Sequence, residues 1–161
     1  MLAHPQRDAE KIAAVAWNGT FPVDPVKIAL RLGIEVKEAS LSSEISGALV
    51  KRFGEDPTIL LNANDHPNRQ RFTCAHELGH FIQREEAADE YEYVDLRHTI
   101  LSASGTKEEE IYANQFAANL LMPQKEVSRL VSEKQTVTQM AMFFGVSQDA
   151  MSFRLKSLNH L

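Results

Sequence analysis

Two histidines four positions apart, His76 and His80, are the residues in this chain best placed to do chemistry. On an α-helix, residues four apart lie on the same face one turn along, so both imidazoles can point at one metal ion. Glu77 projects about 100° around the helix from His76 and can reach a water bound to that metal. The pattern predicts a single zinc ion with Glu77 as general base.

The simpler interpretation of this segment is a solvated helix edge that carries His and Glu side chains. Cys74, Leu78 and Phe81 form an apolar stripe on another face of the same expected helix. That stripe would bury the helix, and titratable groups on a largely buried helix need partners that satisfy them. A metal ion is such a partner, so we favour metal binding. Cys74 lies roughly 200° around from His76, and we expect it to pack rather than bind the metal.

A catalytic zinc site needs a third protein ligand and keeps one position for water. Candidates occur in the run Glu108, Glu109 and Glu110, which precedes an apolar helical stripe. Glu109 and Glu110 both stand at spacings that turn a carboxylate inward, and helical geometry does not choose between them. For Glu108 we favour a solvated position that complements the positive end of the helix dipole.

Periodicity and turn signals predict the elements that must position these residues. We expect an α+β fold in which a small, mainly antiparallel, three-stranded sheet packs on zincin-type helices. The expected helices span residues 8–17, 25–32, 65–84, 107–121, 125–132, 137–144 and 148–158. The expected strands span residues 34–37, 45–52 and 58–62, and the acidic stretch 85–95 is expected to be a solvated loop.

The strand at 45–52 is the best candidate for an exposed sheet edge. An extended peptide could add to such an edge through main-chain hydrogen bonds, which tolerate many sequences. An ordinary edge strand, protected from aggregation by Lys51 and Arg52, is an equally good interpretation.

The last part of the chain supplies a competing class of function. Residues 137–158 have the apolar spacing and central glycine of a helix-turn-helix, as found in DNA-binding regulators. Only Arg154 and Lys156 are basic from residue 137 onward, and Asp149 opens the last helix, so the segment offers little to phosphates. Direct binding of nucleic acid is therefore disfavoured, and we expect a helical module that packs on the rest or holds a substrate.

Composition limits the class of protein. The 161 residues, 43% of them hydrophobic, suffice for one domain at 1–123 followed by the helical helix-turn-helix-like module at 124–161. Seventeen basic and 22 acidic side chains give a net charge of -5, which argues against a surface built for phosphates or anionic lipid. One cysteine and a polar N-terminus lead us to expect a cytoplasmic protein. No apolar run is long enough to span a bilayer.

The chain resembles the ImmA/IrrE metallopeptidases in several separate segments. The clearest matches are RQRFTCAHELGHFI at 69–82 and EIYANQFAANLLMP at 110–123, and further similarity covers residues 23–36 and the SGALV and ILLNAN strands. In that family the third metal ligand is the glutamate that opens the pattern E-x-x-A-N/D-x-F-A. This pattern falls on Glu110, followed by Ala113, Asn114, Phe116 and Ala117.

The resemblance implies a zinc metallo-endopeptidase with His76, His80 and Glu110 as metal ligands and Glu77 as catalytic base. It also implies a protein substrate, a repressor of the helix-turn-helix class, whose cleavage relieves transcriptional repression and releases a stress or mobile-element programme. Asn114 could orient a histidine ligand or could be an ordinary polar residue. A toxin-antitoxin component with the same fold and no catalysis is a third class, which the intact motif residues disfavour.

The sequence does not single out a residue that would stabilise the oxyanion formed during peptide hydrolysis. The possible side chains are Tyr91, Tyr93, Arg97, His98 and Tyr112. For each of these a structural role is the better interpretation.

Overall fold

The computed structural model describes residues 4–86, 93–98 and 106–161 and has an α+β fold. The helices are α1 (Pro5–Ala16), α2 (Pro25–Arg31), α3 (Pro67–Glu86), α4 (Lys107–Leu121), α5 (Gln124–Ser132), α6 (Val137–Phe144) and α7 (Gln148–Ser157). The strands are β1 (Glu35–Ala39), β2 (Ile45–Lys51), β3 (Thr58–Asn62) and β4 (Tyr93–His98). The expected helices and the three expected strands are therefore present, with ends that differ by a few residues.

The sheet has four strands in the order β1-β3-β2-β4 and is mixed. The β1–β3 pair is parallel, whereas β2 is antiparallel to both β3 and β4. The prediction of a three-stranded, mainly antiparallel sheet was therefore wrong in two respects. The parallel pair arises because β3 inserts between β1 and β2. Residues 93–95, which were expected to lie in a loop, belong to the fourth strand. This strand lies at an edge of the sheet, where charged residues are tolerated.

The position of β2 also overturns the expectation of an exposed edge at residues 45–52. β2 lies between β3 and β4, and its main chain pairs with both neighbours. A peptide cannot add to a strand that is already paired on both sides. Among the described strands, β1 and β4 form the two edges of the sheet.

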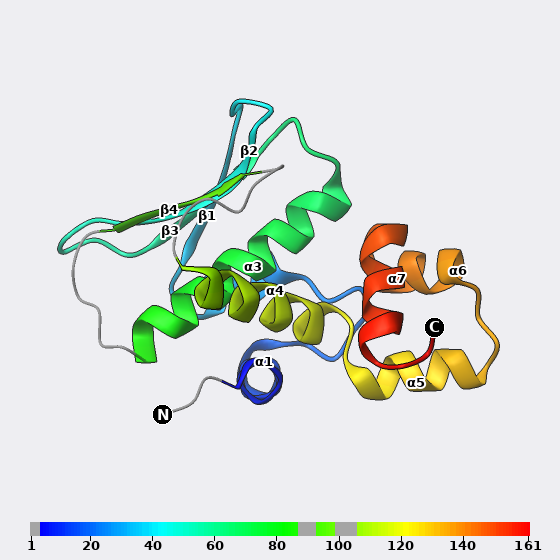
Figure 1. Ribbon diagram of the computed structural model, residues 1–161. Helices are drawn as coiled ribbons and strands as arrows, with labels where there is room; N and C mark the ends of the chain where they lie inside the picture. The colour runs from blue at the N-terminus through cyan, green and yellow to red at the C-terminus, as the bar shows by residue number, and fades with distance from the viewer. Residues whose placement is uncertain (1–3, 87–92, 99–105) are drawn as a thin grey trace.

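Helices α3, α4 and α1 form successive layers beneath the sheet. Figure 1 shows the sheet above α3, with α4 crossing below α3 and α1 at the bottom. Contacts of α3 with β2, β3 and α4, and of α1 with α4, hold these layers together. The stripe predicted on α3 is buried here, with Cys74 and Leu78 inaccessible to solvent. Among the described residues, no helix combines the length and apolar composition needed to cross a membrane.

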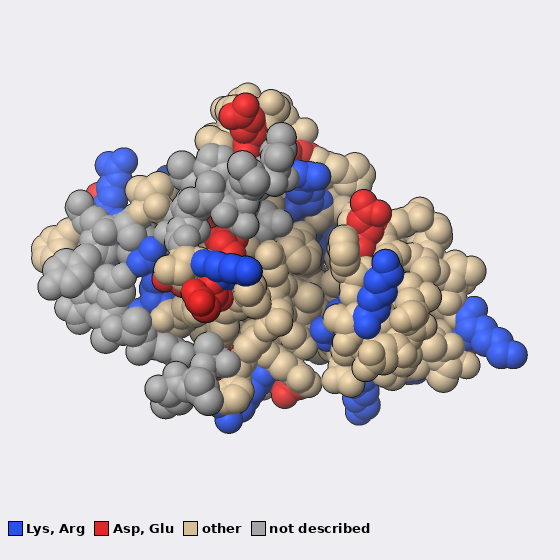
Figure 2. Space-filling view, viewed as in Figure 1, with Lys and Arg blue, Asp and Glu red and all other residues tan. Residues whose placement is uncertain are grey.

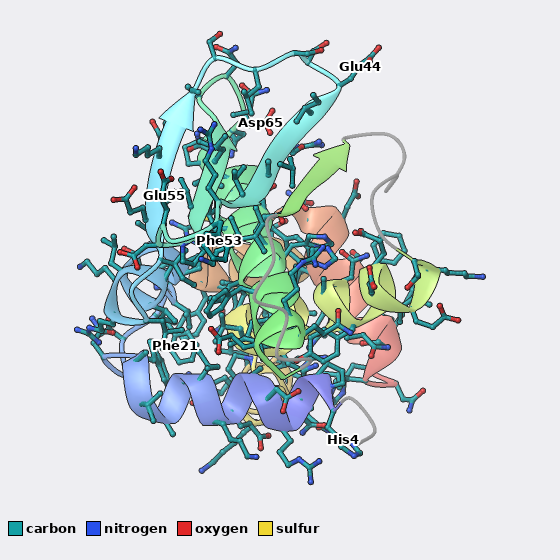
Figure 3. All side chains as sticks on the ribbon, turned by 90° about the vertical axis from the view of Figure 1, so that its left-hand side faces the viewer. His4, Phe21, Glu44, Phe53, Glu55 and Asp65 are labelled. Atoms are coloured by element: carbon teal, nitrogen blue, oxygen red, sulfur yellow. The ribbon has the colours of Figure 1, made fainter. Side chains whose placement is uncertain are left out.

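Helix α1 is joined to α4 by a buried hydrogen bond. The hydroxyl of Tyr112 donates to Oδ2 of Asp8 over 2.7 Å, and both residues are buried. A buried carboxylate is costly unless it is hydrogen-bonded, so this contact fixes where α1 meets α4. Figure 3 shows α1 along the bottom of the molecule, with His4 at its start.

Helices α5, α6 and α7 pack at the end of α4. Arg154 of α7 donates through Nε to the carbonyl of Met122, and Arg71 of α3 donates through Nη1 to the carbonyl of Gly145 over 2.6 Å. Gly145 has φ 65° and ends α6, and a Cβ there would lie 2.2 Å from the Arg71 guanidinium. The buried side chains of this group join the main hydrophobic core. The domain boundary at residue 123 and the helix-turn-helix character of the segment stay predictions.

The layers α3 and α4 approach closely at Gly79. A Cβ at this position would lie 3.1 Å from Cα of Ala113 and 3.2 Å from two side-chain atoms of Phe116. These contacts are tighter than ordinary van der Waals contact, so the two helices can meet here because Gly79 has no side chain. The approach determines where Glu110, one turn before Ala113, sits relative to α3.

Replacing Gly79 with valine is expected to force the two helices apart. Overpacking of a dense core costs about 1–3 kcal/mol, and urea unfolding monitored by circular dichroism would measure the loss in free energy of unfolding. Gly79→Ala is the matched control, since its single methyl group needs a displacement of only a few tenths of an ångström and gains helix propensity. Equal stability of the valine and alanine variants would show that the helices are not in tight contact.

Candidate metal centre

His76 and His80 lie one turn apart on α3, and their imidazoles converge. Their Nε2 atoms are 3.1 Å apart, and the two rings meet edge to face with centroids separated by 4.7 Å. His76 is 1% exposed and His80 is 5% exposed. The face of α3 expected to bind a metal is therefore turned inward.

Glu110 reaches the histidine pair from α4. Its Oε1 lies 2.8 Å from Nε2 of His80, and its Oε2 lies 3.3 Å from Nε2 of His76. His76, His80 and Glu110 are all buried, and one ligand atom from each lies within 4.8 Å of the others. The two histidines, and the glutamate that the family resemblance assigned to the metal, thus form one cluster that can hold a metal ion.

The start of α4 shows why Glu110, and not Glu109, faces the histidines. Thr106 is the N-cap, and its side chain accepts a hydrogen bond from the main-chain N–H of Glu109. The Glu109 carboxylate in turn accepts from the main-chain N–H of Thr106 over 3.1 Å. This capping box occupies Glu109 at the helix start and leaves the next position to turn inward. The capping-box pattern T-x-x-E at residues 106–109 is the sequence signal that Glu110 turns inward. Helical periodicity alone did not reveal it. Glu108 is exposed, as expected.

The surroundings of Glu110 favour its ionised form. Burial alone would raise the pKa of this carboxyl, but hydrogen bonds and charge interactions with His76 and His80 outweigh it and lower the pKa to about 2. A hydrogen bond to the charged form stabilises that form. Glu110 therefore carries its negative charge throughout the physiological pH range.

Asn114 lies one turn after Glu110 and contacts the far side of His76. Its Oδ1 is 2.9 Å from Nδ1 of His76. Since an amide oxygen only accepts hydrogen bonds, this contact favours the tautomer with the proton on Nδ1, which leaves Nε2 as the ring nitrogen that can bind a metal. Of the two interpretations left open for Asn114, the contact agrees with a residue that orients His76.

The donor set fits a zinc ion. Two imidazole nitrogens and a carboxylate oxygen are common zinc ligands, and three protein ligands leave a position for water. At zinc–ligand distances of about 2.0–2.1 Å, tetrahedral geometry separates neighbouring ligand atoms by roughly 3.3 Å. The separations between the ligand atoms here are 3.1, 2.8 and 3.3 Å. A small adjustment of the side chains would complete the coordination.

Glu77 is also buried on α3, directly after the first histidine, with 1% of its surface exposed.

Cys74 packs in the core as expected, and burial there raises the pKa of its thiol, so the reactive thiolate does not form at neutral pH. Among the candidates for stabilising an oxyanion, Tyr112 donates its hydroxyl hydrogen to Asp8 instead. Of the other candidates for stabilising an oxyanion, Tyr91 lies outside the described residues, as do the side chains of Tyr93, Arg97 and His98 in β4.

Comparison with known proteins identifies the family of this chain. The model of the peptidase M78 family, described as the IrrE N-terminal-like domain, matches residues 29–156. The chain is also 29% identical over 138 residues to an uncharacterized immunity region protein 2 of Bacillus phage phi105, covering 86% of this chain and 82% of that protein. The family match spans the buried cluster of two histidines and a glutamate as well as the C-terminal helices. The chain therefore belongs to the IrrE N-terminal-like family of M78 peptidases.

Proposed function

We propose that this protein is a zinc-dependent endopeptidase with His76, His80 and Glu110 as metal ligands and Glu77 as the general base. The observation that carries the proposal is the convergence of three ligand atoms from two helices in a buried site, with Glu77 next to the first ligand. Membership of a peptidase family supports the same chemistry.

Each side chain has a separate task in the proposed hydrolysis. A bound zinc ion would lower the pKa of a water toward 7 and polarise the carbonyl of the scissile bond. The Glu77 carboxylate takes a proton from the attacking water and later passes it to the leaving amine. Asn114 holds His76 in one tautomer, and the ionised Glu110 supplies the single protein charge of the ligand set.

The substrate we propose is a repressor protein of the helix-turn-helix class, so that cleavage relieves transcriptional repression. The relative in Bacillus phage phi105 carries the name of an immunity region, which favours a role in phage or mobile-element regulation. Cleavage of a regulator fits a cytoplasmic enzyme, and the single buried thiol agrees with a reducing compartment.

Glu77→Gln is expected to retain the metal and to lose cleavage, because the amide cannot accept the proton. General acid–base catalysis contributes about 10²- to 10⁴-fold, so the rate constant should fall by at least that range. The assay follows cleavage of a candidate helix-turn-helix repressor, with and without a chelator. His80→Ala should lose both metal and activity. A Glu77→Gln protein as active as the parent would eliminate Glu77 as the base.

Replacing Asn114 with leucine should weaken metal binding about 10- to 100-fold, the usual effect of removing the hydrogen-bond partner of a ligand. Asn114→Asp is the matched control, because a carboxylate accepts the same hydrogen bond with more charge and should preserve or strengthen binding. Competition with a chromogenic chelator measures both affinities, and melting of the metal-free proteins checks that the fold is unchanged. Equal affinity of the leucine and parent proteins would leave Asn114 without a role at the site.

Zinc affinity is expected to fall as the pH is lowered from 8 to 5. An imidazole binds a metal only through a nitrogen that has lost its proton, so protons compete with the metal for both histidines. Glu110 has no proton to lose there, since its pKa is about 2. The logarithm of affinity should therefore change by up to about two for each pH unit, corresponding to two imidazoles. Chelator competition at several pH values measures the slope, and a slope near three would contradict a permanently ionised Glu110.

A further inference from the structure

A groove of about 900 Å³ separates α7 from the first part of α3 and the outer face of α4. In Figure 2 the surface is hollowed between the central part of the molecule and the right-hand group formed by α5–α7. Its volume lies in the range of sites that bind small molecules or a few residues of a peptide. None of the roles assigned above uses this groove.

The groove lies next to the proposed metal centre but is separated from it by one layer of side chains. Asn114 is exposed and lines the groove, while its Oδ1 contacts Nδ1 of His76. The ligand atom Nε2 lies on the opposite side of the same ring. A molecule in the groove would therefore lie behind His76, outside the position of the scissile bond.

Positive charge dominates among the ionised groups of the groove. Arg69 is exposed and Arg154 is buried, and both belong to the lining of the groove. Arg154 uses Nε and Nη2 to bind the carbonyl of Met122 and Oδ1 of Asn119. Across the described parts of the chain, neither arginine forms an ion pair with a carboxylate. His66 and a single acid, Asp149, complete the titratable groups of the lining, although the whole chain has a net charge of -5.

Aromatic side chains from two elements face the same space. Phe153 of α7 is 72% exposed, and Phe72 of α3 is half-buried. Lys156 lies 6.0 Å from the centroid of the Phe153 ring, and the large exposed fraction of Phe153 leaves most of the ring open to a ligand. An exposed phenylalanine and an exposed arginine in the lining of one groove offer an apolar contact and a carboxylate contact within one site.

We propose that this groove is a second recognition site that receives a segment of the protein substrate in which a large apolar side chain adjoins a carboxylate. The site rests on the proposed peptidase function and would position the substrate from outside the catalytic centre. Arg69 pairs with the carboxylate, and Phe153 covers the apolar side chain. The exposed side-chain amide of Gln115 lines the same groove and can hydrogen-bond the peptide main chain. The net negative charge of the protein and Asp149 at the rim disfavour a nucleic acid as the occupant.

The test uses the full-length, metal-free protein and three acetylated, amidated tetrapeptides with the central pairs Leu-Glu, Leu-Gln and Ala-Glu. Backbone amide shifts in proton–nitrogen NMR spectra should change saturably in α7, α4 and the start of α3. We expect the Leu-Glu peptide to bind about 5-fold more tightly than the Leu-Gln peptide, the size of effect of an exposed ion pair. The loss of apolar contact in the Ala-Glu peptide should weaken binding about 10-fold.

Two pairs of variants locate the binding. Arg69→Gln should abolish the preference for Leu-Glu over Leu-Gln, whereas Arg52→Gln, at an exposed arginine just after β2, should not. Phe153→Ser should weaken binding of the Leu-Glu peptide about 10-fold. Phe53→Ser is its control, since Phe53 is 78% exposed in the turn between β2 and β3, labelled in Figure 3. Absence of saturable shifts at 10 mM peptide, roughly the weakest binding such contacts give, would overturn the proposal. The proposal would also be overturned if each variant and its control changed peptide binding equally. Larger amide shifts in the groove with a DNA duplex than with the Leu-Glu peptide would overturn it as well.

An error in the groove proposal and an error in the peptidase proposal would give different experimental results. If Arg69→Gln and Phe153→Ser cleave the repressor with the KM of the parent, the groove is not a substrate site although the enzyme is a peptidase. If the peptides bind the groove while Glu77→Gln remains fully active, the recognition site is supported and Glu77 is not the catalytic base. A raised KM with an unchanged kcat for both groove variants is the expected result.

Discussion

The close contact between α3 and α4 at Gly79 is the constraint on which the site depends. Because no side chain separates Gly79 from Ala113 and Phe116, the backbones of the two helices come near enough for Glu110 to reach His80. The same contact buries the two histidines and the glutamate together, away from competing water. Three polar side chains in such a place need one another or a shared ion to offset the cost of burial.

The helix ends then decide which side chains take part. The capping box at Thr106 sets the first turn of α4, so that Glu109 binds main chain and Glu110 points inward. Four positions later Asn114 reaches His76 from the same face. At the other end of α4, Arg154 binds the carbonyl of Met122 and fixes α7 against it. Helix α4 therefore supplies one member of the candidate metal cluster, the side chain that contacts His76 from behind, and the attachment of the C-terminal helices.

Local patterns in the sequence were sufficient to predict the helices and the convergence of the two histidines. The four-residue spacing of His76 and His80 depends only on the geometry of one helix, and the structure agrees with it. Glu110 was identified from its motif, because spacing alone left Glu109 equally possible. The sheet was predicted less well, since β3 inserts between β1 and β2, and β4 pairs with β2 although the two strands are far apart in the sequence. Such pairing, like the groove beside α7, depends on contacts between distant segments that no local pattern records.

The hydrogen bond between Asp8 and Tyr112 joins residues 104 positions apart. During synthesis, α1 leaves the ribosome long before α4 exists, so its buried carboxylate has no partner while most of the chain is made. The same delay applies to His80 and Glu110, which are 30 positions apart. A nascent chain that ends before residue 110 contains both histidines without the carboxylate that joins them. Both the completed centre and the docking of the first helix therefore require α4, which is made late in the chain.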